Sequence, residues 1–305
     1  TTLYAQWIAK TYTITYDANG GTASASNKTV TYDAKYGTLA TATKTGYTFA
    51  GWFTSATGGT QITEDTTVKI TTTTTLYAHW TAIKWTIKYD ANGGTGTMAD
   101  TTHTWLGGIK SSENTFTRTG YTFNGWYMSR TRNGVTEWLY GNANGLFING
   151  GSWYEEGKQP TGTIKYRLKN GEMCGETTYI NGDVLTAHAQ WTANTYKVTY
   201  DPNGGTGTMA GDTIAYDANY TTKANTFTKT GYTFAGWNEK ADGTGTSWTA
   251  YIGKALKWTY TKDVTLYAQW KANNYTVTLD ANGGSVTPTS ITVTYDGTYK
   301  DLPTP

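Results

Sequence analysis

The chain has 305 residues, and its 24 basic and 22 acidic side chains give a formal net charge of +2. An even balance without a basic run lacks the electrostatic footprint of a nucleic-acid-binding protein. No stretch approaches the roughly 18 apolar residues of a membrane-spanning helix and no signal peptide opens the sequence, so we expect no membrane insertion. The single cysteine, Cys174, excludes an intramolecular disulfide.

Aromatic residues are unusually abundant for a chain with so few charges. They make up 15% of the residues, as do the charged side chains, and they include 25 Tyr and 13 Trp. The hydrophobic fraction of 37% is low because Leu, Ile, Met and Ala are scarce, so long helices are not expected. Thr and Tyr favour half-buried pleated surfaces. The composition therefore predicts an all-β protein.

Three sequence blocks recur in the same order along the chain. The opening block, of the type YTITYDANGGT, begins at Tyr12, Trp85, Tyr196 and Tyr275. The second block, TGYTFAGW or TGYTFNGW, ends at Trp52, Trp126 and Trp237. The closing block, of the type LYAQW, ends at Trp7, Trp80, Trp191 and Trp270.

This order predicts a tandem array of small modules. Complete modules are expected at 11–80, 85–191 and 196–270, with a closing strand of a preceding repeat at 1–7 and the opening part of a further repeat at 275–305. The middle module carries an insertion at about 128–185. The links between modules are only about four residues long, so we expect neighbours to hold fixed relative orientations.

Each module has a local pattern typical of β-structure. Tyr12, Ile14 and Tyr16 alternate with Thr, which predicts a strand with one apolar face. The Asp-Ala-Asn-Gly-Gly segment that follows is turn chemistry, in which the Asp side chain can bond nearby backbone N–H groups. In the second block, Gly51-Trp52 interrupts the alternation as a β-bulge would.

The three blocks in this order resemble the Listeria–Bacteroides repeat, the family of the B repeat of internalin B. The resemblance covers the whole chain except the insertion. It implies an all-β to α+β fold of β-grasp-like modules, each a sheet of about four strands packed on a short helix or loop, arranged as beads in an elongated array. It also implies an extracellular location on the bacterial cell surface and a stalk or adhesive role instead of catalysis.

No catalytic, cofactor or metal site is expected from the recurring residues. His79 stands where the other copies have Gln, His188 stands where they have Tyr, and His103 aligns with Ile214 or its neighbour, so none marks a shared reaction centre. One acid recurs per turn (Asp17, Asp90, Asp201 and Asp280), too few for calcium, which takes six to eight oxygen ligands. These aspartates are interpreted as turn-stabilising residues.

The insertion holds the only candidate ligand-binding residues. Exposed Trp and Tyr suit glycans and proteins, and the insertion is rich in both. The alternative is that these aromatics form the small core of the insertion or pack between modules. The candidates are Trp138, Tyr140, Trp153, Tyr154 and Tyr166.

The sequence thus leaves several functional hypotheses. The first is a non-enzymatic structural or adhesive segment, a semi-rigid stalk or fibre whose partners are neighbouring repeats or subunits of the same protein. The second is a module that binds carbohydrate or a host receptor through the insertion. An enzyme is disfavoured, because no acid–base group recurs. Head-to-tail strand donation between subunits would form a filament, although a longer repeat protein explains the incomplete end modules better.

Overall fold

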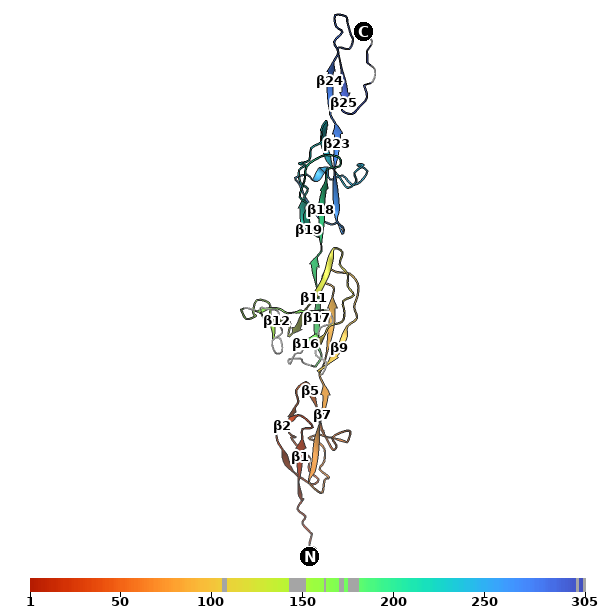
Figure 1. Cartoon of the computed structure of the whole chain (residues 1–305). Coiled ribbons are helices and arrows are strands. Elements are labelled where there is room, and N and C mark those ends of the chain that lie inside the picture. The colour runs from red at the N-terminus through yellow and green to blue at the C-terminus, as the bar shows by residue number, and fades with distance from the viewer. Residues whose placement is uncertain are drawn as a thin grey trace. The chain divides into compact units, whose positions relative to one another are not determined.

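The computed structural model describes residues 1–105, 109–142, 152–161, 163–169, 173–174, 181–299 and 302–303. The chain forms two compact units, one of residues 1–117 and 123–190 and one of residues 118–122 and 191–305. Nearly all regular structure is β-strand (Figure 1), and the described residues contain no α-helix. The expectation of a nearly all-β protein is confirmed. The resemblance implied a short helix or a loop packed on each sheet, and the described residues contain no such α-helix.

A five-stranded sheet forms the first part of the first unit, in the order β3-β1-β7-β5-β6. The central strands β1 and β7 run parallel, and the outer pairs are antiparallel. The short strands β2 and β4 form a separate antiparallel pair. The strands are β1 Thr11–Asp17, β2 Thr22–Ala23, β3 Asn27–Thr31, β4 Ala42–Thr43, β5 Tyr47–Phe53, β6 Gln61–Ile62 and β7 Thr74–Ala82.

The turn after β1 has the hydrogen bonds that its sequence predicts. Asn19 adopts a positive φ of 46°, and its backbone N–H donates to Asp17 Oδ1 at 2.8 Å. The Asn19 side chain donates to the Ala78 carbonyl on β7 at 3.1 Å. The Asp-Ala-Asn-Gly-Gly block therefore both reverses the chain and ties the turn to the closing strand.

The interruption at Gly51-Trp52 is a β-bulge, as expected. The register between β5 and β7 shifts between Phe49 and Gly51, and Gly51 has a φ of 129° that other residues rarely adopt. The shift turns Trp52 into the core, where 1% of its surface is exposed. Its indole N–H donates to the Ala40 carbonyl at 2.7 Å, so the buried polar atom is satisfied.

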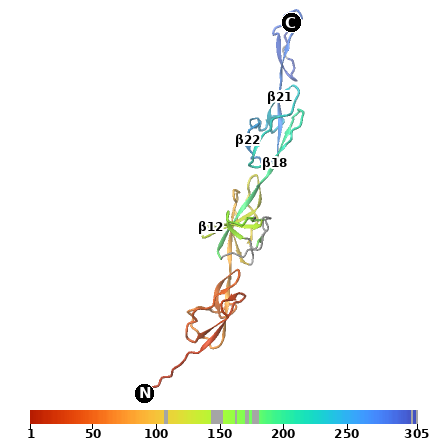
Figure 2. The same cartoon turned by 90° about the vertical axis from the view of Figure 1, so that its left-hand side faces the viewer.

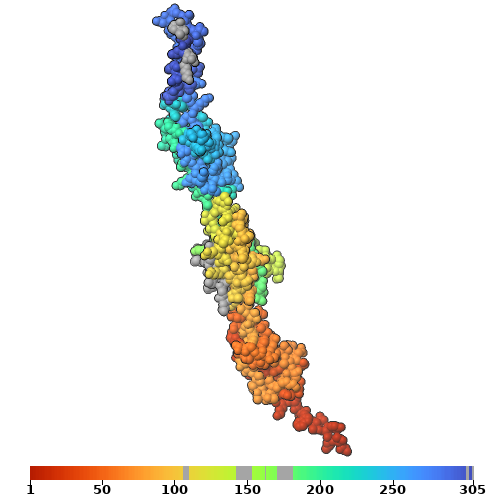
Figure 3. Space-filling model, turned by 90° about the vertical axis from the view of Figure 1, so that its right-hand side faces the viewer, coloured from red at the N-terminus to blue at the C-terminus, as the bar shows by residue number. Residues whose placement is uncertain are grey.

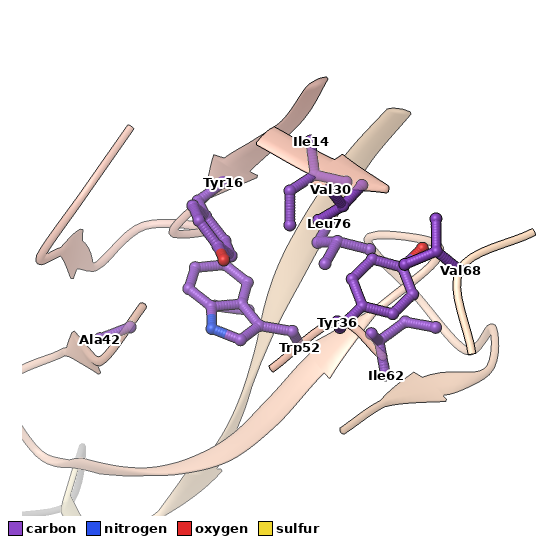
Figure 4. Packing of buried hydrophobic residues seen from close by; sticks show 10 residues of the cluster. Ile14, Tyr16, Val30, Tyr36, Ala42, Trp52, Ile62, Val68 and Leu76 are labelled. Carbon is purple, nitrogen blue, oxygen red and sulfur yellow. The ribbon is translucent and has the colours of Figure 1, made fainter. Parts of the chain in front are cut away.

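The core of this sheet is assembled around that indole. Figure 4 shows Tyr16 beside Trp52, with Ile14, Val30 and Leu76 to the right of Tyr16, and the two rings lie 4.6 Å apart between centroids. Because a large ring buries roughly 150–250 Å², a few aromatic residues can stabilise so small a sheet. The recurring aromatic blocks thus supply the core in this part of the chain.

Much of the rest of the first unit is an eight-stranded sheet. Its main path is β13-β12-β11-β17-β8-β9, with β14 paired to β12 and β15 paired to β11. As in the first sheet, the opening strand β8 and the closing strand β17 are parallel. The strands of this region are β8 Lys84–Asp90, β9 Thr101–Thr104, β10 Ile109–Lys110, β11 Tyr121–Arg132, β12 Val135–Asn142, β13 Ser152–Glu155, β14 Thr163–Lys165, β15 Arg167–Leu168, β16 Met173–Cys174 and β17 Asp183–Ala193.

The second unit, whose strands β18, β21 and β22 are labelled in Figure 2, has a sheet similar to the first. This four-stranded sheet has the order β19-β18-β23-β21, again with a parallel central pair and a bulge, here between Phe234 and Gly236. Two further antiparallel pairs are β20 with β22 and β24 with β25. The elements are β18 Thr195–Asp201, β19 Asp212–Ala215, β20 Asn219–Thr221, β21 Tyr232–Asn238, the 3-10 turn η2 Thr249–Tyr251, β22 Ala255–Lys257, β23 Val264–Ala272, β24 Asn274–Thr278 and β25 Ser290–Thr294.

Candidate functional site

The insertion builds an aromatic lobe, defined here as β12 to β15 together with residues 127–132 of β11. In β12 and β13, Trp138 pairs with Tyr154 and Leu139 pairs with Trp153. Neighbours along a strand point to opposite faces, so the lobe has a face with Leu139 and Trp153 and another with Trp138 and Tyr154.

Three of the five candidate residues lie inside the lobe. Tyr140, Trp153 and Tyr166 expose only 5%, 8% and 6% of their surfaces, whereas Trp138 and Tyr154 are half-buried. The ring centroids of Tyr140 and Tyr154 are 6.1 Å apart in an edge-on contact. The structure therefore places four of the five on the paired strands β12 and β13 and Tyr166 between β14 and β15, and of the five only Trp138 and Tyr154 are partly accessible from outside.

A buried cation, Arg130, lies on the inner face of the lobe, which is the face with Leu139 and Trp153. Arg130 is 6% exposed, and its Nε donates to Glu137 Oε2 at 2.8 Å. Its guanidinium carbon lies 4.5 Å from the centre of the Trp153 ring, within the range of a cation–π contact. Trp153 is thus packed against Arg130 inside the lobe. This agrees with the alternative given above, in which the aromatic residues form the small core of the insertion.

On the outer face of the lobe, which is the face with Trp138 and Tyr154, a second cation lies over an aromatic ring. Lys165 Nζ lies 4.0 Å from the centre of the Trp138 ring and 2.7 Å from Glu156 Oε1. The Lys165 side chain is 23% exposed, so the contact is only partly open to water. Trp138 is consequently positioned by Lys165.

A groove of about 650 Å³ lies next to this face and was not anticipated from the sequence. It combines cations with apolar and aromatic surface, because Lys165 and Arg167 lie beside Phe123 and Tyr127 of β11. The alternating basic residues were a usable signal for it. The lining includes Phe123, Tyr127, Ile164, Lys165, Arg167 and Lys169.

A Ser–His–carboxylate chain crosses three strands beneath the lobe. Ser129 Oγ lies 2.8 Å from His188 Nε2, and His188 Nδ1 lies 2.7 Å from Asp90 Oδ2. The order resembles that of a hydrolase triad. However, Ser129 is only 6% exposed, so its hydroxyl cannot meet a substrate, and the Trp138 ring lies 4.9 Å from the His188 ring. The chain is best explained as a polar link between β11, β17 and β8.

This link predicts a loss of stability in acid. Burial opposes ionisation of Asp90, but the Asn92 backbone N–H and His188 outweigh it and hold the carboxyl pKa below its ordinary value of 3.8. A depressed folded-state pKa contributes stability that is present above the unfolded pKa and is lost as pH falls through the folded pKa. We expect Asp90→Asn to flatten the dependence of urea unfolding on pH below about 4. An unchanged dependence would contradict this role of Asp90.

The other histidines have unrelated surroundings. His79 Nε2 lies 2.9 Å from the Ser55 carbonyl, and its ring stacks on Phe53 with the centroids 3.9 Å apart. Burial lowers the pKa of His103. Among the described residues, no group of three or more His, Cys, Asp or Glu side chains is placed to hold a metal ion.

The recurring blocks coincide with a known family of repeats. The family model of the Listeria-Bacteroides repeat domain matches residues 12–79, 85–144, 196–269 and 275–305, which is most of the chain. The chain belongs to the Listeria-Bacteroides repeat domain family. The resemblance stated from the sequence blocks is therefore confirmed, and the chain is a tandem array of these surface-protein repeats.

Several curated proteins are similar to this chain. Two are from Evansella cellulosilytica and are both 27% identical: "Putative membrane protein", over 94% of this chain and 48% of the relative, and "Putative Gly-rich membrane protein", over 93% of this chain and 27% of the relative. Internalin H of Listeria monocytogenes is 28% identical over 68% of this chain and 30% of its own length. The chain thus spans less than half of each of these relatives. None of the three names denotes an enzyme.

In the described part of the chain, no helix is long and hydrophobic enough to cross a membrane.

Proposed function

We propose that this chain is a non-enzymatic structural and adhesive segment of a large bacterial surface protein, where it acts as a semi-rigid stalk or fibre. The observation that carries the proposal is the burial of the recurring tryptophans. Trp52, Trp126 and Trp237 are 1%, 0% and 0% exposed. The tryptophan of the second block is thus committed to packing in all three copies, and a repeated scaffold suits a spacer better than a reaction centre.

The strand order supports β-grasp-like modules as the units of this array. The four-stranded sheet of the second unit has the order β19-β18-β23-β21. Numbered along the chain within this sheet, that order is 2-1-4-3, and the central pair β18 and β23 is parallel. The first sheet has the same order with β6 added at its edge. We infer modules at 11–80, 85–191 and 196–270, with neighbouring repeats as their nearest partners.

The names of the relatives support an extracellular, cell-surface location. Two relatives are named as membrane proteins and one is an internalin. An array held at the surface would place other parts of the protein at a distance from the cell.

A repeat-exchange experiment in the full-length parent protein tests the stalk. Deleting residues 11–80 is expected to shorten the reach of the region beyond the array, measured by the access of antibodies of different size to intact cells. Replacing that module by a copy of 196–270 should restore the reach, because a spacer depends on the number of repeats and not on which repeat is present. Failure of the exchanged chain to restore it would contradict the proposal.

A second candidate function rests on the groove beside the aromatic lobe. Its cations and aromatic rings suit an anionic glycan, because the rings can stack on sugar faces while Lys165 and Arg167 neutralise acidic groups. Trp138 and Tyr154 are the two candidate residues that retain exposed surface on the lobe.

This second candidate makes a prediction about Arg167, which lines the groove, and Trp138, which contacts the groove residue Lys165. On an array of acidic and neutral glycans, Trp138→Ala and Arg167→Ala should each lower binding to acidic glycans by roughly tenfold, the effect of losing one stacking or charged contact. Exposed Trp7→Ala, far from the groove in the sequence, is the control and should bind normally. Equal binding by all variants would exclude the groove as the site.

A further inference from the structure

A Gly-Tyr turn from one repeat docks on a Tyr-Asp turn from the next within the second compact unit. Gly120 has a φ of +76°, and a Cβ there would lie 2.2 Å from the Tyr216 ring, so only glycine permits this approach. The next residue, Tyr121, donates its hydroxyl proton to Asp217 Oδ2 at 2.9 Å. Its ring meets the Tyr216 ring edge-on at 5.7 Å.

Asn194, in the linker between the two repeats, also contacts both turns. The two docked turns together with this linker residue are called the joint below. The Asn194 N–H donates to the Gly120 carbonyl at 2.9 Å, and the Asn194 carbonyl accepts from the Tyr216 N–H at 2.8 Å. The Asn194 side-chain oxygen accepts from Thr122 Oγ1 at 2.6 Å. One linker residue therefore joins both turns by backbone and side-chain hydrogen bonds.

The same joint recurs further along the second unit. Gly231 has a φ of +77°, and a Cβ there would lie 2.3 Å from the Tyr295 ring. Tyr232 donates to Asp296 Oδ2 at 3.1 Å, and Asn273 takes the place of Asn194. Two independent copies with the same contacts indicate a built docking pair instead of an incidental contact.

The first repeat holds a third Tyr-Asp turn, at Tyr32 and Asp33. Asp33 has a φ of 65°, close to the 63° of Asp217 and the 57° of Asp296. The Tyr32 N–H donates to the Lys10 carbonyl at 2.9 Å, as Tyr216 does to Asn194. Yet the Asp33 side chain is 60% exposed, whereas that of Asp217 is 34% exposed. The turn has the docking conformation but is more open.

The segment before this turn is exposed, and it includes a leucine whose counterpart is buried in another copy. Leu3, Trp7 and Ile8 are 92%, 92% and 95% exposed, and Figure 3 shows this segment in red. Leu266, the counterpart of Leu3 in the closing block, is 0% exposed. Trp7 precedes Tyr12 by the same five positions that separate Trp191 from Tyr196 and Trp270 from Tyr275. The link ahead of the first repeat therefore has the length required for the joint.

We propose that Tyr32 and Asp33 form a docking site for the Thr-Gly-Tyr turn of a further repeat whose closing strand is Leu3–Trp7. This inference deepens the proposed array function and rests on it. A repeat in the same polypeptide is the occupant that fits, because the three Thr-Gly-Tyr glycines of this chain already approach Trp105, Tyr216 and Tyr295. A second copy of the chain has no such turn to spare.

An extended chain tests the docking site directly. Residues 1–7 are replaced by a copy of 196–270, which supplies the missing repeat in the natural register ahead of Ile8. We expect the Lys10 amide, the counterpart of Asn194, to exchange with deuterium at least tenfold more slowly than in the 305-residue chain. Unchanged exchange at Lys10 in the folded extended chain would overturn the inference.

A double-mutant cycle assigns any protection to the hydroxyl–carboxylate contact. In the extended chain, Tyr232→Phe in the added copy and Asp33→Asn should each speed Lys10 exchange on the order of threefold, and together no more than either alone. Tyr121→Phe with Asp217→Asn is the matched control at an observed joint. Coupling in the control with additive effects at Asp33 would overturn the docking site, and would leave the repeat-exchange test of the stalk unaffected.

The dependence on protein concentration distinguishes a Thr-Gly-Tyr turn from the same polypeptide from one supplied by a second copy of the chain. Lys10 exchange in the 305-residue chain should not depend on concentration. Slower exchange at high concentration would show that a second copy fills the site and would contradict the same-chain occupant.

Discussion

Replacing Trp237 by alanine is expected to lower the free energy of unfolding by about 3–5 kcal/mol, as for other fully buried large aromatic residues. The Trp237 side chain is 0% exposed and lies 4.9 Å from the Tyr200 ring and 5.0 Å from the Phe234 ring, measured between centroids. Its indole N–H donates to the Lys223 carbonyl at 3.0 Å. The substitution therefore leaves a cavity among aromatic rings and an unpaired buried carbonyl.

Urea unfolding followed by far-ultraviolet circular dichroism measures this loss. Trp7→Ala is a matched control, because the same side chain is removed from a site that is 92% exposed. The control should change stability by less than about 0.5 kcal/mol. Equal effects of the two substitutions would show that the recurring tryptophans do not form the cores of the sheets.

Gly120→Ala is expected to destabilise the second unit by about 2–5 kcal/mol, the sum of backbone strain and overpacking. The left-handed backbone at a φ of +76° costs a non-glycine residue about 1–2 kcal/mol. The added Cβ would also lie 2.2 Å from Tyr216, and overpacking of this kind typically costs about 1–3 kcal/mol. Thermal unfolding of the full chain, with the fraction unfolded followed at several wavelengths, measures the combined loss.

Gly253→Ala separates backbone strain from the clash. Gly253 has a φ of +71°, but a Cβ there meets nothing within 4 Å. Its substitution should cost only the strain, about 1–2 kcal/mol. If Gly120→Ala were no more destabilising than Gly253→Ala, the close approach to Tyr216 would not contribute to stability.

Sequence reasoning located the features that depend on local pattern. The alternation of Tyr12, Ile14 and Tyr16 predicted β1, and the Asp17 side chain bonds the turn as expected. The bulge at Gly51 follows from a glycine that interrupts the alternation before a large ring. These features depend on residues close in the sequence, where period and turn chemistry are informative.

The features missed depend on residues far apart in the sequence. Asp90 meets His188 because β8 and β17 are parallel neighbours in a register that pairs these two residues. The sequence left the five candidate aromatics of the insertion open between a ligand site and a core of the insertion itself. Tyr140, Trp153 and Tyr166 are buried, and Trp153 packs on the buried Arg130. Neither register nor burial can be read from composition.

Stretching single molecules of the full chain between its ends tests the central claim most directly. If the modules are separate load-bearing folds, the chain should unfold in discrete steps. Each step should equal the extended length of the module, about 25 nm for residues 11–80 and about 38 nm for residues 85–191 at about 3.6 Å per residue, less the length of the folded module. Trp237→Ala should weaken only the step that belongs to 196–270. A single step releasing the whole chain, or extension without resistance, would contradict an array of independently folded repeats.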